Sequence, residues 1–283
     1  MLNTTGAEKI AFQGELGAYS HQACREVYPD LEPLPCPTFE AALEAVRSRE
    51  ADLAMMPIEN STYGRVADLH HLLPTSGLYI IGEHFVPVHL QLMGPPGSTL
   101  AGVTHAHSHT VALGQCKAFL GQHGISAVIH ADTAGSAAMV AERADPTQAA
   151  IASRLAGEIN GLEILAENIQ EFDHNRTRFL VMSRQRVEAE PDNDTAMTSF
   201  VFEVRNVPAA LYKAMGGFAT NGVNMVKLES YMLNGAFTAT QFYAEIEGHP
   251  EDPGVIHAFE ELGFFTKHLK VLGVFPRSSA RGD

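Results

Sequence analysis

The side chains best suited to acid–base chemistry lie in a short polar segment, residues 171–178. Thr177 and Arg178 end this segment, and the apolar residues 179–182 that follow predict a buried strand. A threonine hydroxyl can donate or accept a proton at a fixed place, and a guanidinium matches the geometry of a carboxylate. The segment therefore fits a small anionic ligand. A loop whose polar groups merely cap the strand is an equally weighted alternative.

A second polar cluster follows another apolar run. Residues 51–58 predict a buried strand, which ends in Glu59, Asn60 and Ser61. In an open α/β sheet, ligands bind at the carboxyl ends of the strands, so Asn60 and Ser61 are expected to contact a ligand. Ordinary turn and capping chemistry is the alternative interpretation of these residues.

A third pair of polar side chains lies on a predicted helix. Ser108 is expected to open this helix, which runs to about residue 120. Gln115 lies seven residues further on, two turns along the same face, so both side chains can point toward one cleft. A simple N-cap is the alternative role of Ser108.

Three histidines near this helix resemble a metal-binding pattern. His105, His107 and His109 alternate, as ligands on one face of a strand would. The neighbouring Cys116 and acidic residues do not complete a recognisable ligand set. Because the chain has 14 histidines, chance clusters are expected, and the sequence predicts neither a metal nor another cofactor.

The size and charge of the chain narrow the classes of protein. With 283 residues, 45% of them hydrophobic, two globular domains are expected. The formal net charge of −14 argues against a nucleic-acid or anionic-membrane partner. No apolar stretch approaches membrane-spanning length, and the first residues lack the pattern of a secretory signal. Three scattered cysteines fit thiols in a reducing cytoplasm, so a cytoplasmic location is expected.

Short strands and helices alternate along the first two thirds of the chain. This order predicts a mainly parallel, doubly wound sheet in two lobes. The predicted strands are 9–12, 33–37, 51–58, 125–130, 148–152 and 162–169, and the chain is expected to cross between lobes within 78–93. Thr38 is predicted to cap one helix, and four others are expected to begin at Ser20, Ser61, Ser108 and Thr133. If those four starts face one cleft, their N–H groups would bind a multiply charged carboxylate without a metal.

A second unit follows a polar linker. Residues 185–195 lack apolar periodicity, and residues 196–276 then show the order strand, helix, strand, strand, helix, strand. The predicted elements are strand 198–205, helix 208–220, strands 224–231 and 236–247, helix 251–262 and strand 265–275. This order predicts a ferredoxin-like βαββαβ sandwich, with Asn221 and Gly222 ending its first helix. Its exposed sheet edge predicts pairing with another subunit, as a homodimer or homotetramer.

Taken together, these segments resemble the prephenate dehydratase family with a C-terminal ACT regulatory domain. The resemblance rests on residues 11–14, 57–61, 108–109, 115–116 and 175–179. It implies a catalytic domain (1–184) with two lobes like a type II periplasmic binding protein, a linker (185–195) and an ACT domain (196–283). It also implies an active site between the lobes and conversion of prephenate to phenylpyruvate, with release of water and carbon dioxide, in phenylalanine biosynthesis.

The resemblance assigns roles to individual residues. Thr177 resembles the catalytic hydroxyl that assists departure of the ring hydroxyl, either as the proton donor or as the group that positions another donor. The other residues at catalytic positions of the family are Asn60, Ser108 and Gln115, and the neighbouring candidates for substrate binding are Glu59, Ser61, Arg178 and Phe179. Prephenate carries two carboxylates, which helix N-termini and Arg178 are expected to hold.

Two segments of the second unit resemble the family's phenylalanine-binding motifs. The expected effector-binding residues are Ala209, Ala210, Leu211, Asn224, Glu229 and Ser230. The family usually has glycine where Ala209 stands, and arginine-proline where Tyr231 and Met232 stand. The resemblance implies that L-phenylalanine is an allosteric inhibitor. Because an added methyl at Ala209 can obstruct the approach of a ligand, a dimerisation module that no longer senses an effector is the alternative.

Two further readings of the function stay open at this point. Arogenate, the amino analogue of prephenate, differs by one keto-to-amino change, which only a few pocket contacts would distinguish. A cytoplasmic sensor that binds an amino acid or carboxylate without turnover comes from another class of protein. Pure binding needs donors but no leaving-group catalyst, so Thr177 beside Arg178 favours the enzyme.

Overall fold

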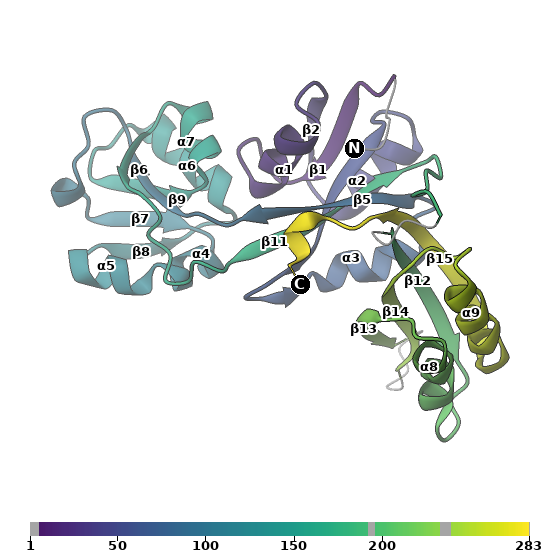
Figure 1. Ribbon diagram of the computed structural model, residues 1–283. Coiled ribbons are helices and arrows are strands. Elements are labelled where there is room, and N and C mark those ends of the chain that lie inside the picture. Colours follow the sequence, from purple (N-terminus) through teal and green to yellow (C-terminus); the bar gives the residue numbers. More distant parts are fainter. Residues whose placement is uncertain (1–5, 192–195, 233–238, 283) are drawn as a thin grey trace.

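The computed structural model describes residues 6–191, 196–232 and 239–282, which form three sheets. Figure 1 shows these sheets in three bodies: two lobes joined by long strands, and a third domain against one of the lobes. The predicted combination of a two-lobed α/β unit with a ferredoxin-like unit is confirmed. In the described residues, no helix combines the length and the apolar character that crossing a membrane requires.

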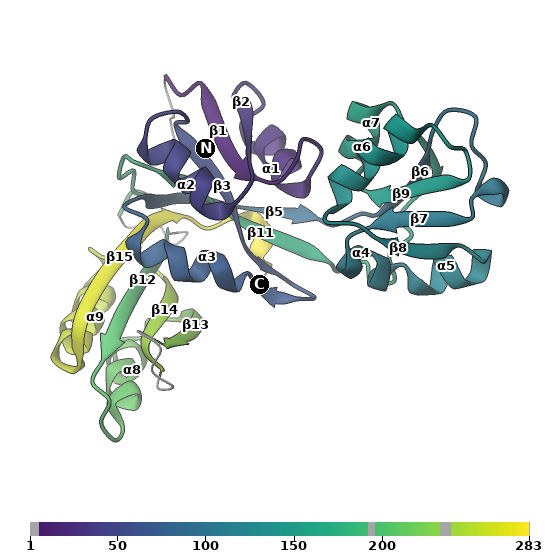
Figure 2. The ribbon, with the colours of Figure 1, turned by 180° about the vertical axis from the view of Figure 1, so that it is seen from behind.

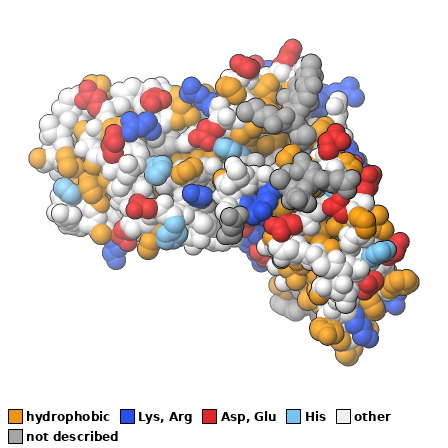
Figure 3. Space-filling model, in the orientation of Figure 1, with side chains coloured by type: hydrophobic (Ala, Val, Ile, Leu, Met, Phe, Trp, Pro, Cys, Tyr) orange, Lys and Arg blue, Asp and Glu red, His pale blue; other side chains and the backbone are white. Residues whose placement is uncertain are grey.

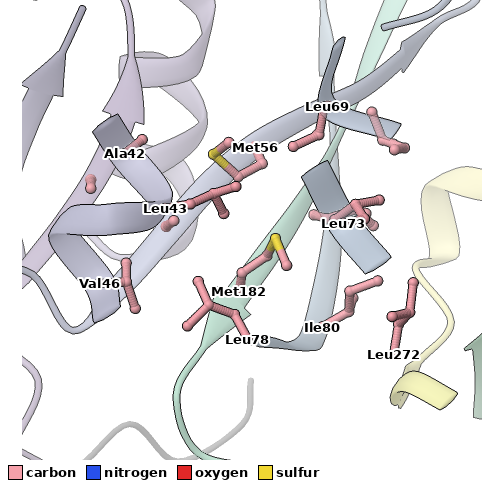
Figure 4. Packing of buried hydrophobic residues seen from close by; sticks show 14 of the residues in the cluster. Ala42, Leu43, Val46, Met56, Leu69, Leu73, Leu78, Ile80, Met182 and Leu272 are labelled. Carbon is pink, nitrogen blue, oxygen red and sulfur yellow. The ribbon is translucent and has the colours of Figure 1, made fainter. Parts of the chain in front are cut away.

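The first lobe has a mixed sheet in the order β2-β1-β3-β11-β5, and β4 pairs with β3. Its strands are β1 (Lys9–Gln13), β2 (Glu32–Cys36), β3 (Leu53–Asn60), β4 (Gly64–Arg65), β5 (Tyr79–Pro87) and β11 (Arg176–Ser183). Its helices are α1 (Tyr19–Val27), α2 (Phe39–Arg47), α3 (Ala67–Leu72) and the 3-10 turn η1 (Leu73–Thr75). Leu43 and Val46 of α2 pack against Met56 and Met182 of the sheet (Figure 4).

The second lobe has the sheet order β10-β6-β9-β7-β8. Its strands are β6 (Gln91–Gly94), β7 (His105–Ser108), β8 (Ser126–Ile129), β9 (Gln148–Ala152) and β10 (Glu163–Ala166). Its helices are α4 (Thr110–Gln115), α5 (Lys117–His123), α6 (Thr133–Arg143), α7 (Arg154–Asn160) and the 3-10 turn η2 (Leu100–Gly102). Mainly alanine, leucine, valine and isoleucine side chains fill the core between the sheet and its helices.

Two crossings connect the lobes. The chain leaves the first lobe through β5 and returns through β11, and these strands pair antiparallel along their length. Figures 1 and 2 show them side by side between the lobes. The predicted crossing within 78–93 agrees with this path. Because the returning strand begins at Arg176, Thr177 lies close to the junction of the two lobes.

The sheets are not mainly parallel, and that part of the prediction is wrong. β1, β2 and β3 are parallel, but β11 enters antiparallel to both β3 and β5. In the second lobe, β6 is likewise antiparallel to β9 and β10. The antiparallel pairs lie at the strands that connect the lobes. A strand that returns from the other lobe enters the sheet from the opposite end and therefore runs antiparallel to its neighbours.

The predicted helix starts are correct at Thr133 but not at Ser61 or Ser108. Ala18 precedes α1 as its N-cap, so Ser20 lies inside that helix, and Ser61 lies in the turn between β3 and β4. Ser108 is the last residue of β7, because the pairing of β7 with β8 continues to Ser108 and Ile129. Thr133 begins α6 as predicted, but the N-cap of that helix is Asp132. A ring of serine- and threonine-capped helix starts therefore does not form.

Other local predictions are confirmed. Thr38 caps α2, with its hydroxyl oxygen accepting a hydrogen bond from Ala41 N at 3.1 Å. The predicted helix 108–120 is confirmed only in part, because it begins at Thr110 and forms as two helices, α4 and α5, which meet at Cys116. Gly222 follows the first helix of the third domain with a φ of +69°, the left-handed conformation predicted for its end.

The third domain has four antiparallel strands in the order β13-β14-β12-β15. Its elements are β12 (Ala196–Val204), α8 (Ala210–Thr220), β13 (Met225–Met232), β14 (Ala239–Glu247), α9 (Pro253–Phe265) and β15 (Thr266–Pro276), followed by η3 (Ser279–Arg281). Phenylalanines of α8, α9 and β12 form its core. Residues 192–195 of the predicted linker and 236–238 of the predicted strand lie outside the described residues.

The face of this sheet opposite its helices packs on the first lobe. Tyr231, Tyr243 and Leu272 join the apolar cluster that contains Leu69 of α3. Gly273 of β15 lies against β5, where an added Cβ would stand 2.0 Å from the carbonyl oxygen of Ile80. Glycine is required at this position because the two backbones approach so closely. The third domain is therefore fixed to the lobe that carries β3 and β11.

Candidate active site

Thr177 and Asn60 face each other across two neighbouring strands. They are register partners in the antiparallel pair β11 and β3. The side-chain amide of Asn60 donates to Thr177 Oγ1 at 3.0 Å. Since Thr177 Oγ1 accepts this hydrogen bond, its own O–H proton stays available for another acceptor. The geometry thus favours Thr177 as a hydrogen-bond donor to a ligand.

Asn175 joins this pair to the second lobe. Its Oδ1 accepts a hydrogen bond from Asn60 Nδ2 at 2.7 Å, and its Nδ2 donates to Gln115 Oε1 at 3.0 Å. Asn175 and Gln115 are 2% and 5% exposed, so these amides depend on each other for hydrogen bonds. The four residues Thr177, Asn60, Asn175 and Gln115 are called the amide network below. Asn175 was not among the predicted catalytic residues, although its side chain stands two residues before Thr177 in the same polar segment.

The loop after β3 holds Asn60 in place. Asn60 Oδ1 accepts hydrogen bonds from the backbone N–H groups of Thr62 and Tyr63 at 2.9 and 3.0 Å. Ser61 Oγ donates to His174 O and accepts from Arg176 N, both at 2.9 Å. Ser61, predicted to bind substrate, therefore fastens the β3 loop to the segment before Thr177.

A β-bulge lies directly beside the Thr177–Asn60 pair. Arg178 pairs with Glu59, but Phe179 pairs with Pro57, so Ile58 is the extra residue in β3. Bulges re-aim the side chains beside them and are frequent next to active sites. This bulge sets the direction of Thr177 and Asn60 relative to the rest of the sheet.

Phe179 and Arg178 are both almost fully buried, but only Arg178 borders a cavity, which it lines together with Asn60 and Ser61. Phe179 is 1% exposed and packs in the core of the first lobe. Arg178 is 2% exposed and forms ion pairs with Glu59, Glu83 and Glu245. Burial opposes its charge, but the carboxylates outweigh that effect and raise the pKa of Arg178 well above its usual value. In this structure Arg178 is thus paired with carboxylates of its own chain, and its binding of a substrate carboxylate stays a prediction.

Glu59, another predicted substrate-binding residue, is shared between two cations. Its Oε1 accepts from Arg178 at 2.9 Å, and its Oε2 is paired with Lys227 of β13. Burial by itself would raise the pKa of Glu59, but Lys227 and Arg178 hold that pKa below its usual value. Glu59 is therefore ionised and bound to the third domain.

Ser108 and its neighbouring histidines are not bonded to the amide network. Ser108 is fully buried, and its hydroxyl donates to Ile151 O at 2.6 Å. His107 Nε2 is paired with Gln148 Oε1 at 2.7 Å, and His109 Nδ1 accepts from Val111 N at the start of α4. In the part of the chain that the structure describes, no group of three or more metal-ligating side chains comes together.

The expected effector-binding residues fall into two places on the third domain. Ala209, Ala210 and Leu211 line a cavity of about 250 Å³ at the start of α8. Glu229 and Ser230 lie on β13, where Glu229 forms an ion pair with Arg65 of the first lobe at 3.1 Å. The Asn224 side chain donates to Glu247 Oε2 at 2.8 Å, just before β13 begins. These described residues do not form a single pocket within one chain.

The fold and the site define a two-lobed α/β enzyme with an added βαββαβ domain, and comparisons with known proteins agree. Residues 10–187 match the family model described as prephenate dehydratase. The chain is 49% identical over 276 residues to the bifunctional N-acyl-homoserine lactone acylase/prephenate dehydratase of Komagataeibacter europaeus, with 98% of each covered. It is 35% identical over 287 residues to arogenate dehydratase/prephenate dehydratase 1, chloroplastic, of Arabidopsis thaliana, covering 96% of this chain and 73% of that protein.

A solved structure of a prephenate dehydratase is also similar to this chain. The prephenate dehydratase of Arthrobacter aurescens, solved in complex with L-Phe, has a TM-score of 0.86 at 30% identity, with 95% of this chain and 90% of that chain covered. The chain belongs to the prephenate dehydratase family. It is a carbon–oxygen lyase of aromatic amino acid biosynthesis, which sets aside the reading as a sensor without turnover.

Proposed function

We propose that the protein converts prephenate to phenylpyruvate at the amide network. In this reaction the ring carboxylate leaves as carbon dioxide, its bonding electrons make the ring aromatic, and the ring hydroxyl departs. The departing oxygen takes up a proton and leaves as water. Much of the driving force lies in the substrate, so the protein needs to orient it and to supply that proton.

The observation that carries this proposal is the hydrogen bond from Asn60 to Thr177. Asn60 donates to the threonine oxygen, which directs the O–H of Thr177 outward as a donor to the leaving oxygen. Through Asn175, the same network reaches Gln115 on the other lobe. Closure of the lobes around substrate would thus be communicated to the proton donor by direct hydrogen bonds.

The test is to mix the purified protein separately with prephenate and with arogenate, and to follow phenylpyruvate and phenylalanine. A higher kcat/KM for prephenate is expected, because a relative with 49% identity is named a prephenate dehydratase. A higher value for arogenate would overturn the substrate assignment and keep the reaction class. Absence of product from both substrates would overturn the proposed function.

L-Phenylalanine is the proposed effector, bound on the third domain. The cavity at Ala209, Ala210 and Leu211 supports this, as does the relative of Arthrobacter aurescens whose structure was solved with L-Phe. Addition of L-phenylalanine is expected to lower kcat/KM for prephenate. If it does so by weakening the binding of prephenate, prephenate must weaken the binding of phenylalanine by the same factor. Unchanged kinetics at saturating phenylalanine would leave the domain a dimerisation module.

A homodimer or homotetramer is the proposed assembly. The sheet of the third domain ends in edge strand β13, which exposes Val226, Leu228 and Met232. Tyr212 and Phe264 of the same domain are 80% and 75% exposed, and Figure 3 shows hydrophobic side chains at its outer end. Apolar edge strands of this kind favour pairing with a second copy. Light scattering after size-exclusion chromatography would test this, and a monomer at micromolar concentration would contradict it.

A second candidate activity is hydrolysis of N-acyl-homoserine lactones. The observation that favours it is the 49% identity, over 98% of both chains, to a protein whose name includes this acylase activity. Such an acylase cleaves an amide with water and releases a fatty acid and homoserine lactone. Incubation with an N-acyl-homoserine lactone and detection of both products by mass spectrometry would test it. A Thr177→Val variant that retains the acylase would place that activity at another site.

A further inference from the structure

A buried ionic network connects the strand of Thr177 to the third domain. Each of the three nitrogens of Arg178 donates to a different carboxylate: Nε to Glu83 at 2.7 Å, Nη1 to Glu59 at 2.9 Å and Nη2 to Glu245 at 2.9 Å. The side chains of Glu83 and Glu245 are fully buried. Glu83 lies on β5 and Glu59 on β3, but Glu245 lies on β14 of the third domain. Arg178 is thus held from both domains at once.

Arg281 of η3 binds the far side of the same carboxylates. It donates to both oxygens of Glu83, at 2.7 and 2.8 Å, and to Glu245 Oε2 at 2.8 Å. Ser278 N also donates to Glu83, at 2.9 Å. The Arg281 side chain is only 14% exposed. Arg281 therefore closes the network on the side opposite Arg178.

The charges of this network balance. Its carboxylates are Glu59, Glu83 and Glu245, and its cations are Arg178, Lys227 and Arg281. Burial of carboxylates is costly unless each is paired and hydrogen-bonded, so loss of one cation leaves an uncompensated buried negative charge. The remaining members would then move toward water or toward other partners.

Two members of the ionic network are direct neighbours in the sequence of Thr177 and Asn60, so a displacement of the network would also displace these two residues. Arg178 directly follows Thr177 on β11, and Glu59 directly precedes Asn60 on β3. The bulge at Ile58 lies beside both pairs. Ala280 and Arg281 also line a cavity of about 320 Å³ together with Asn60 and Ser61. Ala280 and Arg281 therefore form part of the wall of the cavity beside Asn60.

We propose that Arg281 is a positioning residue for the dehydration: it holds Glu83 and Glu245, which hold Arg178, which fixes the direction of Thr177. This inference rests on the proposed function, since it concerns the geometry of the same proton donor. It also makes the third domain part of the catalytic unit, because β14 supplies Glu245 and β13 supplies Lys227. Arg178 is a positioning residue of the same kind, because it directly follows Thr177 on β11.

The test compares variants of the full chain in the prephenate assay. Arg281→Ala is expected to lower kcat by about tenfold to hundredfold with little change in KM, because a small misplacement of a reacting group has an effect of this size. Arg281→Lys keeps the charge and is expected to recover part of kcat. Arg277→Ala is the matched control on the same segment, since among the carboxylates of the described residues Arg277 contacts only Glu247, at 3.7 Å.

A second substitution separates positioning from general damage. Glu83→Gln in the Arg281→Ala background removes the unpaired charge and keeps an acceptor for Arg178, so kcat is expected to rise above that of Arg281→Ala alone. A kcat of Arg281→Ala within twofold of the unaltered protein would overturn the inference. A double variant as slow as Arg281→Ala, despite equal stability to urea, would overturn it as well.

Hydrogen exchange makes the test independent of the reaction. Arg281→Ala is expected to speed amide exchange in residues 176–179, whereas Arg277→Ala is not. If the unaltered protein does not turn over prephenate or arogenate, the proposed function fails, and unchanged exchange in this segment would then overturn the positioning role separately. Faster exchange there would support it in the absence of turnover.

Discussion

The side chains of Asn175 and Gln115 are joined by a 3.0 Å hydrogen bond from Nδ2 to Oε1, although one residue precedes β11 and the other ends α4 in the second lobe. Both side chains are almost fully buried. This bond is a direct connection between the lobes at the proposed site. It also ties the second lobe to Asn60 and Thr177 through the other atoms of the same amide.

Replacement of Asn175 should affect both stability and turnover. Asn175→Ala removes the hydrogen bond to buried Gln115 and one of the two acceptors of the Asn60 amide, which costs about 1–3 kcal/mol of unfolding free energy. A fall in kcat of about tenfold or more is expected with it, because the Asn60 amide loses its orientation. Urea unfolding and the prephenate assay measure the two effects. In a double-mutant cycle, Gln115→Ala should be non-additive with Asn175→Ala, and strict additivity would refute the coupling.

Removal of the Thr177 hydroxyl should be the most damaging single change for turnover. Thr177→Val keeps the size and β-branching of the side chain, so folding is expected to stay intact. Loss of a positioned proton donor lowers kcat by about 10²–10⁴-fold. Thr177→Ser is the matched control, since it keeps the hydroxyl, and it should stay within about tenfold of the unaltered protein. Normal turnover by Thr177→Val would remove this hydroxyl from the mechanism.

Ala209 has a strained backbone that glycine would relieve. Its φ is +60°, a left-handed conformation that L-residues with a Cβ adopt at a cost. Ala209→Gly is expected to raise the unfolding free energy by up to about 1 kcal/mol and to tighten binding of L-phenylalanine at the adjacent cavity. Ala210→Gly, one residue on and inside α8, should instead destabilise by about 0.5–1 kcal/mol. Calorimetric titration and urea unfolding would measure both, and equal effects of the two changes would contradict the argument.

The contact between α3 and the third domain should weaken in acid because of His70. His70 is 1% exposed, its Nδ1 is bonded to the Tyr231 hydroxyl, and its ring packs against Tyr243. Burial, followed by the nearby Lys227, lowers the pKa of His70 to about 4 from an ordinary 6.5. The unfolded chain thus binds a proton at His70 more readily than the folded chain does. The contribution of His70 to the free energy of unfolding is therefore complete above pH 6.5 and falls as the pH drops toward 4.

Between pH 6.5 and pH 4, protonation of His70 is expected to lower the free energy of unfolding by on the order of 3 kcal/mol, at most about 1.4 kcal/mol for each pH unit. Glu59 and Glu229 oppose the effect of Lys227 and Arg65 on this ring. His70→Phe should flatten the dependence of urea unfolding on pH between 6.5 and 4. His71→Phe, on the exposed side of the same helix, is the matched control. An unchanged slope in His70→Phe would show that another group titrates.

The sequence by itself determined those features that depend on neighbours along the chain. The apolar run 179–182 gave a buried strand, Thr38 capped its helix, Gly222 ended α8, and the order of elements in the third domain was predicted as found. Such features follow from backbone propensities and from hydrogen bonds within a few residues. The two segments that carry Asn60 and Thr177 were found the same way, because polar side chains directly follow or precede apolar runs.

Only the tertiary structure decided which distant groups meet. Arg178 was expected to hold a substrate carboxylate, since a guanidinium in a polar segment has no visible partner in the sequence, but folding brings Glu59, Glu83 and Glu245 to it. Ser108 was expected to open a helix, but pairing with β8 extends the strand through it and turns its hydroxyl to Ile151. The physical reason is the same in both cases. A buried polar group must bind whichever partner the packed strands bring within reach, and residues far away in the sequence supply that partner.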